Sequence, residues 1–184
     1  MRLFIALSLS PGFKKAAGAL VARQKNAISG VKWVKESAMH LTLKFLGEVD
    51  AGDCGKIKEA IAASLDSFSP FELGLRGVGV FPSPSGARVL WAGVSPGAEE
   101  SAAMAAALDQ GLTPLGFKAE KRKFSAHLTL GRLRYPVPEG SIRHFLEREK
   151  DFQTGTSLIE EVVLYVSDLT PRGAIYTPLY SNRL

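Results

Sequence analysis

The tetrapeptide His40-Leu41-Thr42-Leu43 recurs as His127-Leu128-Thr129-Leu130, and these stretches contain two of the three histidines of the chain. Upstream, Arg2-Leu3-Phe4-Ile5-Ala6 resembles Arg88-Val89-Leu90-Trp91-Ala92, starting 38 residues before the first histidine and 39 before the second. Because both similarities have nearly the same offset, they indicate an internal duplication. The repeat predicts two structurally similar halves, about residues 1–86 and 87–184, in a single bilobal domain that spans residues 1–184.

The two halves show the same order of predicted elements. Each begins with a β-branched or aromatic run (3–9, 89–94), a Pro-Gly turn and an alanine-rich helix (13–27, 99–112). A short strand and the histidine-bearing strand follow, then a second helix (54–66, 140–149) and a closing strand (71–80, 158–167), with an extended run near 174–180 at the end. Helices and strands do not alternate strictly. We therefore expect an α+β fold with two pseudo-symmetric lobes, each a mostly antiparallel sheet with helices on its outer face.

The composition is that of an ordinary globular protein. The chain has 184 residues, of which 46% are hydrophobic and 22% charged, which excludes disordered and fibrous proteins. A formal net charge of +5 favours an anionic partner. The single cysteine, Cys54, excludes an internal disulfide and multi-cysteine metal sites. Met1-Arg2 and the apolar run after them resemble a short signal peptide, but the repeat favours a buried strand there. With no apolar run long enough for a membrane helix, we expect a cytoplasmic protein.

The repeated motif has a chemical consequence if it lies on strands. Side chains alternate between the faces of a strand, so His40 and Thr42 share one face while the leucines anchor the other. His127 and Thr129 repeat this arrangement. Two converging pairs suit in-line displacement at phosphorus: one imidazole takes a proton from the attacking oxygen, the other protonates the leaving oxygen, and the threonines hold phosphate oxygens.

Other interpretations of the histidines remain open. Both could be partly buried residues of ordinary strands. A zinc site would need three or four protein ligands, whereas only two motif histidines are available and His144 lies in a separate helical stretch. A catalytic Ser or Cys nucleophile has no supporting motif, since Cys54 lies in a glycine-rich turn.

Positive charge is concentrated around the second motif. Between positions 118 and 134 there are six cations and one anion, Glu120; the cations are Lys118, Lys121, Arg122, Lys123, Arg132 and Arg134. This cluster predicts a site for a phosphodiester, although a solvated basic hairpin would have the same composition. Lys44 has the same parity as His40 and Thr42, so we expect it to bind phosphate in the cleft. Arg132 has the opposite parity to His127, so its side chain would reach the cleft only past a bulge or at the end of the strand. Gly131 would permit such a bulge or leave room for substrate.

These residues resemble a known family. Paired His-x-Thr-x motifs 87 residues apart are typical of the two-histidine phosphoesterase superfamily. More narrowly, the chain resembles the bacterial and archaeal RNA 2′,3′-cyclic phosphodiesterases, also described as 2′-5′ RNA ligases. The resemblance spans nearly the whole chain, through the stretches 2–6, 33–47, 79–91 and 124–132. It departs from the family pattern at Ala126, where proline is usual, and at Gly131, where alanine is usual.

The resemblance implies a fold, an activity and residue roles. Both motifs would line a central cleft, and the enzyme would open a terminal 2′,3′-cyclic phosphate of RNA to a 2′-phosphate without a metal or other cofactor. His40 would donate a proton to the leaving 3′-oxygen, and His127 would accept one from water. Thr42 and Thr129 would bind phosphate oxygens with help from Arg132. A 5′-hydroxyl in place of water would give a 2′-5′ linkage.

Two rival functions fit the same residues. One is an enzyme of this superfamily that acts on a small cyclic nucleotide or on ADP-ribose 1″,2″-cyclic phosphate. The other is a non-catalytic module that binds RNA ends, although binding alone does not require two titrating groups. We expect a monomer whose partners are RNA ends with a 2′,3′-cyclic phosphate. The two motifs are identical, so the residues alone do not assign acid and base.

Overall fold

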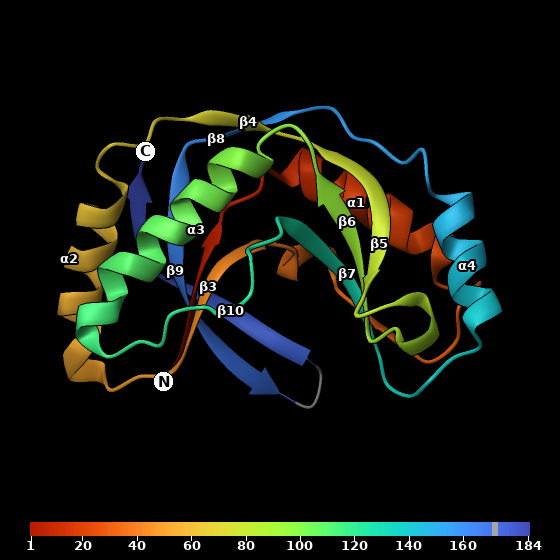
Figure 1. Cartoon of the computed structure of the whole chain (residues 1–184), viewed down its shortest axis with the longest axis horizontal. Helices are drawn as coiled ribbons and strands as arrows, with labels where there is room; N and C mark the ends of the chain where they lie inside the picture. Colours follow the sequence, from red (N-terminus) through yellow and green to blue (C-terminus); the bar gives the residue numbers. More distant parts are fainter. Residues whose placement is uncertain (171–172) are drawn as a thin grey trace.

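The chain forms two lobes side by side, each built on a four-stranded antiparallel sheet (Figure 1). The computed structural model describes residues 1–170 and 173–184. The sheet of the first lobe has the order β10-β9-β1-β3. Its strands are β1 (Arg2–Leu7), β3 (Leu41–Glu48), β9 (Glu161–Thr170) and β10 (Gly173–Arg183). The sheet of the second lobe has the order β2-β7-β6-β5. Its strands are β2 (Val31–Trp33), β5 (Leu75–Phe81), β6 (Val89–Val94) and β7 (His127–Leu133).

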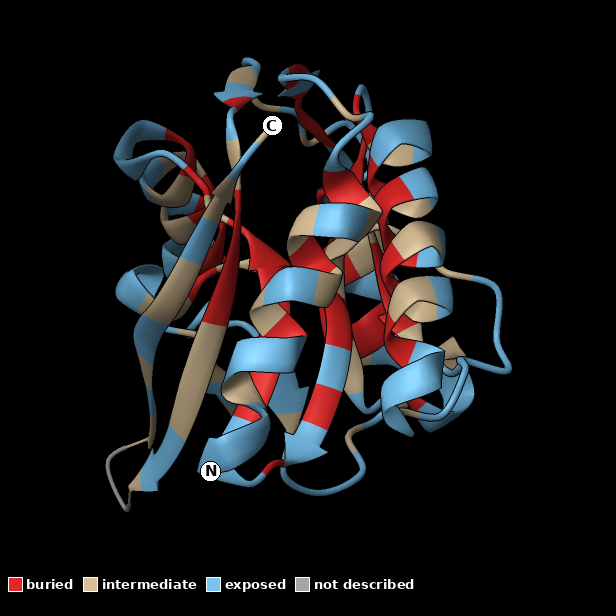
Figure 2. Cartoon of the chain, turned by 90° about the vertical axis from the view of Figure 1, so that its left-hand side faces the viewer, coloured by how far each residue is buried: buried red, intermediate tan, exposed pale blue. Residues whose placement is uncertain are grey.

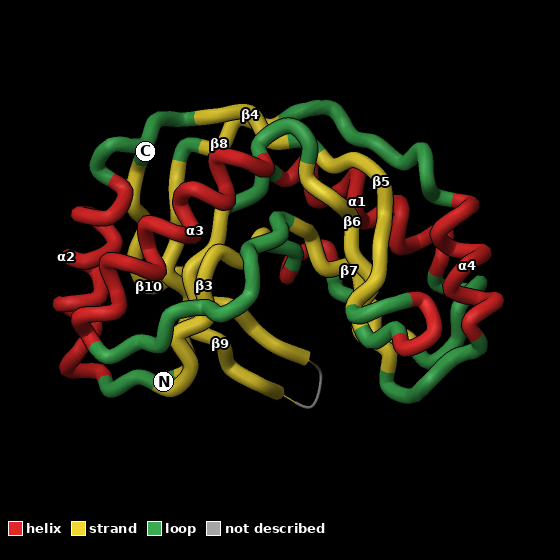
Figure 3. Tube along the Cα trace, viewed as in Figure 1, coloured by secondary structure: helices red, strands yellow, loops and turns green. Residues whose placement is uncertain are grey.

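Helices cover the outer side of each lobe, with the sheets between them (Figure 3). In the first lobe these are α2 (Cys54–Leu65) and α3 (Ala98–Leu112), and in the second α1 (Pro11–Gln24) and α4 (Glu139–Arg148). The sequence predicts a Pro-Gly turn and then a helix over 13–27, but α1 already begins at Pro11 and ends at Gln24. Ser10 caps it by accepting a hydrogen bond from the Phe13 amide at 3.3 Å, and Pro11 has no amide hydrogen that needs a partner. The predicted α+β fold with two lobes and outer helices is confirmed.

Each lobe is assembled from both halves of the chain. The repeat predicts two similar halves, and strands pair between them: β9 from the end of the chain pairs with β1, and β5 pairs with β6 across the midpoint. The helices exchange in the same way. Helix α3 follows β6 of the second lobe yet packs against α2 and β3, while α1 follows β1 of the first lobe and reaches α4 through an ion pair of Arg23 with Glu149. The duplication is therefore intertwined rather than arranged end to end.

The apolar stripes of these elements form the core (Figure 2). Residues 3–7 of β1 are all buried, as expected for a central strand. Helix α2 buries Ile57, Ile61 and Leu65, which repeat every four residues along one face. Together these faces exclude water between each sheet and its helices. In the described part of the chain, no helix is long and apolar enough to span a membrane.

Three predicted strands differ from those observed. The strand expected over 71–80 is divided into β4 (Phe71–Leu73) and β5, and the one over 158–167 into β8 (Ser157–Ile159) and β9. The first pieces, β4 and β8, form a separate two-stranded sheet. The short strand expected before His127 is wrong, because residues 117–126 contain no strand. There the Glu120 amide donates to the side chain of Asp109 instead of to a neighbouring strand.

Candidate active site

The two motif strands lie where the lobes meet. His40 immediately precedes β3, an edge strand of the first sheet, and His127 opens β7 of the second sheet. Strands β3 and β7 contact each other across the boundary between the lobes. The duplication therefore brings its two copies together at one place in the molecule (Figure 1).

The two histidines are held in the same way. Nδ1 of His40 lies 2.9 Å from the carbonyl oxygen of Ala38, and Nδ1 of His127 lies 2.7 Å from that of Ser125. A carbonyl oxygen only accepts, so each Nδ1 carries the proton that it donates. In a neutral imidazole this leaves Nε2 unprotonated and available to a substrate. Both rings are therefore fixed in the same tautomer by backbone two residues upstream.

Each motif strand carries a β-bulge at the fourth residue of the tetrapeptide. In β3 the register passes from Ala6↔Thr42 to Ile5↔Lys44, which leaves Leu43 as the extra residue. In β7 the register passes from Trp91–Thr129 to Leu90–Gly131, which leaves Leu130 in the same role. A bulge reverses the alternation of side chains beyond it.

The bulges decide which side chains share a face with the motif threonines. Lys44 lies opposite Ile5 on the helix-covered face, and its side chain is only 2% exposed and paired with Asp109 of α3. The prediction that Lys44 reaches the cleft is therefore wrong. Phe45 instead lies on the same face as Thr42. In β7 the bulge turns Gly131 to the buried face and places Arg132 on the same face as His127 and Thr129. This is the bulge that the sequence predicted as one condition for Arg132 to share that face.

Burial and nearby cations set the charge state of both imidazoles. Burial lowers the pKa of His40, the bond to Ala38 opposes this, and the charges of Lys14 and Arg132 lower it further. Burial also lowers the pKa of His127, opposed by the bond to Ser125 and reinforced by Arg132. Arg132 thus acts on both rings. In the free protein at neutral pH both histidines are neutral.

Aromatic side chains that the motifs did not predict surround the histidines. Phe4 and Tyr176 lie beside His40, with ring centroids 4.7 and 4.9 Å away. On the other side, Phe81 lies 5.1 Å from His127. Burial raises the pKa of Tyr176, so its phenol stays protonated at neutral pH. Phe4 lies in the repeated first strand, where an aromatic residue was visible in the sequence, whereas Tyr176 lies in β10, over which the sequence predicted only an extended run near 174–180.

A model of the LigT-like phosphoesterase family matches the chain twice, over residues 7–91 and 93–176. The chain belongs to this family. It is 34% identical to an RNA 2′,3′-cyclic phosphodiesterase of Methanothermobacter thermautotrophicus, over 100% of this chain and 99% of the relative. It is also 34% identical to the protein of the same name from Archaeoglobus fulgidus, over 97% and 98%. A crystal structure of a Thermus thermophilus protein matches with a TM-score of 0.78 and 29% identity, over 100% and 98%.

The six cations near the second motif of this LigT-like phosphoesterase divide into two groups. Arg132 lies in β7, and Arg134 is the first residue after that strand. Lys118, Lys121, Arg122 and Lys123 are exposed on residues 116–126, which we call the basic loop. The basic loop leaves the first lobe after α3 and ends at His127 in the second lobe (Figure 1). Within residues 1–170 and 173–184, no three His, Cys, Asp or Glu side chains are grouped to hold a metal ion.

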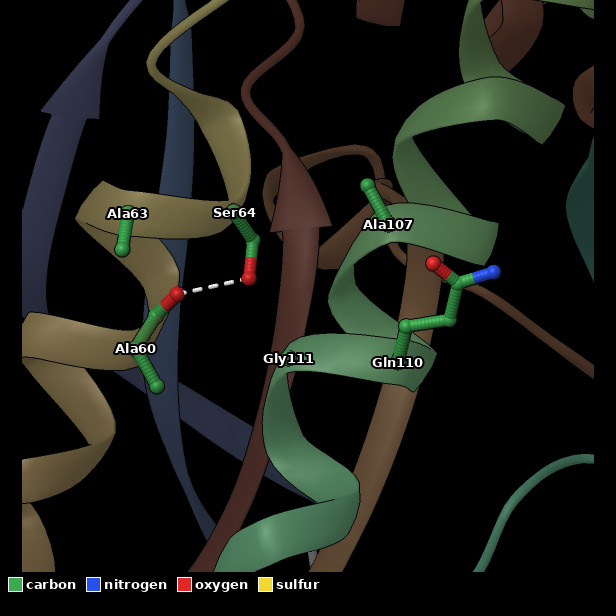
Figure 4. A pocket seen from close by; sticks show the side chains of 6 residues that line it. All are labelled: Ala60, Ala63, Ser64, Ala107, Gln110 and Gly111. Carbon is green, nitrogen blue, oxygen red and sulfur yellow. Dashed lines mark hydrogen bonds between the residues drawn. The ribbon is translucent and has the colours of Figure 1, made fainter.

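A depression between α2 and α3 is separate from this site (Figure 4). Its lining residues are Ala60, Ala63, Ser64, Ala107, Gln110 and Gly111, none of which is ionisable. The Ser64 hydroxyl donates to the carbonyl of Ala60 at 2.7 Å. A Cβ at Gly111 would collide with Ser64 Oγ, so these small residues allow the two helices to approach closely. The depression thus reflects helix packing in the phosphoesterase and belongs to no reactive group.

Proposed function

We propose that this phosphoesterase hydrolyses a terminal 2′,3′-cyclic phosphate of RNA to a 2′-phosphate by acid–base catalysis between His40 and His127, without a metal. The observation that carries the proposal is the matched pair of Nδ1–carbonyl bonds, at 2.9 and 2.7 Å, which leaves both Nε2 atoms available. Two proton-transfer groups on opposite sides of one phosphate suit in-line displacement. A binding module would not need both.

Water attacks phosphorus while His127 Nε2 takes its proton, and the bond from phosphorus to the 3′-oxygen breaks. His40, entering as imidazolium, gives its Nε2 proton to that oxygen, so the products are a 2′-phosphate and a free 3′-hydroxyl. Thr42 and Thr129 donate hydrogen bonds to the remaining phosphate oxygens. The charge of Arg132 stabilises the transition state, in which negative charge on the phosphate increases. A 5′-hydroxyl in place of water would instead give a 2′-5′ linkage.

The acid needs a proton that the free protein does not hold at neutral pH. Burial, Lys14 and Arg132 all lower the pKa of His40. A bound phosphodiester carries a negative charge and raises the pKa of a nearby imidazole. Substrate binding would therefore help to charge the acid, so that the phosphate recruits the proton needed to cleave it.

RNA as the substrate is supported by the relatives and by charge. The Methanothermobacter and Archaeoglobus relatives are both named RNA 2′,3′-cyclic phosphodiesterase. The exposed cations of the basic loop would attract a polyanion longer than a mononucleotide. We also propose that the enzyme acts as a monomer in the cytoplasm. A chain with a single cysteine forms no internal disulfide, which fits the reducing conditions of that compartment.

The deciding experiment uses a short RNA that ends in a 2′,3′-cyclic phosphate, incubated with the purified protein in excess chelator. We expect a product whose phosphate is on the 2′-oxygen, assigned by phosphorus NMR. A 3′-phosphate product would reverse the choice of leaving oxygen. Activity that is lost in chelator and restored by zinc or magnesium would overturn the metal-free mechanism. Turnover of ADP-ribose 1″,2″-cyclic phosphate in preference to RNA would overturn the substrate assignment. Adding an RNA with a free 5′-hydroxyl measures ligation in the same assay.

A further inference from the structure

Lys44 is a buried cation whose contacts lead away from the histidines. The bulge at Leu43 turns it to the helix-covered face of β3, where its side chain is 2% exposed. Its Nζ lies 2.5 Å from Oδ1 of Asp109 in α3 and 3.1 Å from the carbonyl oxygen of Lys118. One ammonium group therefore joins the strand of the first motif, a helix and the start of the basic loop.

Asp109 holds the same loop from its other side. Its two carboxylate oxygens each accept from the backbone amide of Glu120 at 3.1 Å. The backbone on both sides of residue 119 is thus held, through the Lys118 carbonyl by Lys44 and through the Glu120 amide by Asp109. These bonds are made where the sequence had predicted a strand, so two side chains replace the sheet partner that the loop lacks.

Residues 118–120, whose backbone is held in this way, directly precede three exposed cations. Lys121, Arg122 and Lys123 follow Glu120, and His127 follows four residues later. The positive charges of these three consecutive residues repel one another. Fixing the backbone at residues 118 and 120 limits where these cations can lie relative to β3 and the first motif.

We propose that Lys44 and Asp109 are positioning residues that hold the basic loop so that its cations meet the RNA strand upstream of the cyclic phosphate. The proposal rests on the proposed function and adds to it a source of preference for RNA over small cyclic nucleotides. A buried ion pair contributes little stability compared with an apolar pair of similar volume. We therefore expect removal of the Lys44–Asp109 pair to change the position of the loop more than the stability of the protein.

The test removes both charges together, because either single variant leaves a charge without its partner. In Lys44→Met/Asp109→Leu no unpaired charge is buried, and all three hydrogen bonds to the loop backbone are lost. We expect limited trypsin digestion to cut faster after Lys121, Arg122 and Lys123. We also expect KM for an RNA oligonucleotide with a 2′,3′-cyclic phosphate to rise about tenfold, as for partial loss of three phosphate contacts. Values for a cyclic-phosphate dinucleotide should change less than about twofold, since it does not reach the loop.

Two further variants sharpen the result. Lys121→Gln/Arg122→Gln/Lys123→Gln should raise KM for the oligonucleotide in the wild-type background and have a smaller effect in the double variant, because the loop no longer presents these charges.

Arg23→Met/Glu149→Gln is the matched control. It removes an ion pair with a buried carboxylate between α1 and α4 in the second lobe, and it should leave loop cleavage and both KM values unchanged.

The outcomes separate the two proposals. Unchanged trypsin cleavage of the loop, or an equal rise in KM for oligonucleotide and dinucleotide, overturns the positioning role. Inactive wild-type protein overturns the proposed function alone, because loop cleavage and the anisotropy of a fluorescent RNA still report on the loop. If the double variant does not fold, as judged by near-ultraviolet circular dichroism, Lys44→Met alone is used; faster loop cleavage and a selective rise in KM are still required.

Discussion

Phe45 and Arg132 occupy equivalent positions, each five residues after its motif histidine, and each lies on the same face of its strand as the motif threonine. The two bulges that place them there are at the same point of the repeat. Phe45 is 57% exposed, and its ring centroid lies 6.0 Å from that of Phe4, which in turn contacts His40. The site is therefore asymmetric at this position although its motifs are identical. The first motif carries an aromatic side chain here, and the second carries a cation.

Arg132→Gln should lower kcat/KM by about 10- to 100-fold, the range expected for losing a charged hydrogen bond of about 1.5–3 kcal/mol. It should also raise the pKa of both histidines, because the Arg132 charge lowers both. Steady-state kinetics across pH would measure both effects. Arg148→Gln, an exposed position in α4, is the control and should behave as wild type. A rate loss without any pH shift would mean that Arg132 contacts substrate but lies too far from the rings to affect them.

His40→Gln and His127→Gln should each lower the rate about 10²- to 10⁴-fold, the usual contribution of a general acid or base. The double variant should be scarcely slower than either single one, because the two groups act as a unit in one step. Single-turnover rates on a cyclic-phosphate RNA would show this. The third histidine provides the control: His144 is exposed on α4, and His144→Gln should retain full activity. Near-normal turnover in either motif variant would favour a binding module over an enzyme.

Much of the fold could be predicted because the duplication is explicit. The repeated strands, helices and motifs predicted the α+β class. They also predicted that His40 and Thr42 share one face of their strand, and that His127 and Thr129 share one face of theirs. The exchange of elements between halves could not be predicted. Pairing β1 with β9 joins residues about 160 positions apart, for example Leu3 with Val166, and no local pattern distinguishes this from pairing within a half.

The failure at Lys44 has a specific physical cause. Strict alternation assigns Lys44 to the cleft and Arg132 to the opposite face, and a single extra residue in each strand reverses both assignments. Gly131 suggested a bulge in the second motif. In the first motif the same position is occupied by Lys44 itself, so nothing marked the bulge. The partner that makes a buried lysine tolerable there, Asp109, lies 65 residues away in the sequence.

Gly131→Ala should destabilise this protein, although alanine is usual there in the family. A Cβ at this position would lie 2.5 Å from Cγ1 of Val31 and 3.0 Å from Cε3 of Trp33, both in the neighbouring strand β2. Overpacking of this kind costs about 1–3 kcal/mol. Urea unfolding would measure the loss of free energy. Val31→Ala combined with Gly131→Ala makes room for the added methyl group and should recover most of it. An unchanged urea midpoint in Gly131→Ala would mean that β2 moves aside freely.

The free energy of unfolding should fall as the pH drops below about 6.5, the ordinary value for histidine in the unfolded chain. Burial lowers the pKa of His40 and His127 in the folded protein, so between the folded and unfolded values the unfolded chain binds more protons. The slope is at most about 1.4 kcal/mol per pH unit for each histidine. Urea midpoints between about pH 5.5 and 8 would measure it. His127→Gln should reduce the slope, because it removes one of the two buried imidazoles.

The pH dependence of the rate tests the two-histidine mechanism most directly, because kcat/KM reports the free enzyme and kcat the bound complex. One imidazole must be neutral and the other charged. Since the pKa of both is lowered in the free protein, the maximum of kcat/KM should lie below about 6.5. Bound phosphate raises the pKa of the acid, so the alkaline limb of kcat should lie at higher pH than that of kcat/KM. The two limbs belong to the coupled pair until one histidine is removed. Profiles that stay flat from about pH 5 to 9 would mean that neither imidazole titrates in a rate-controlling step, and the acid–base roles of His40 and His127 would have to be abandoned.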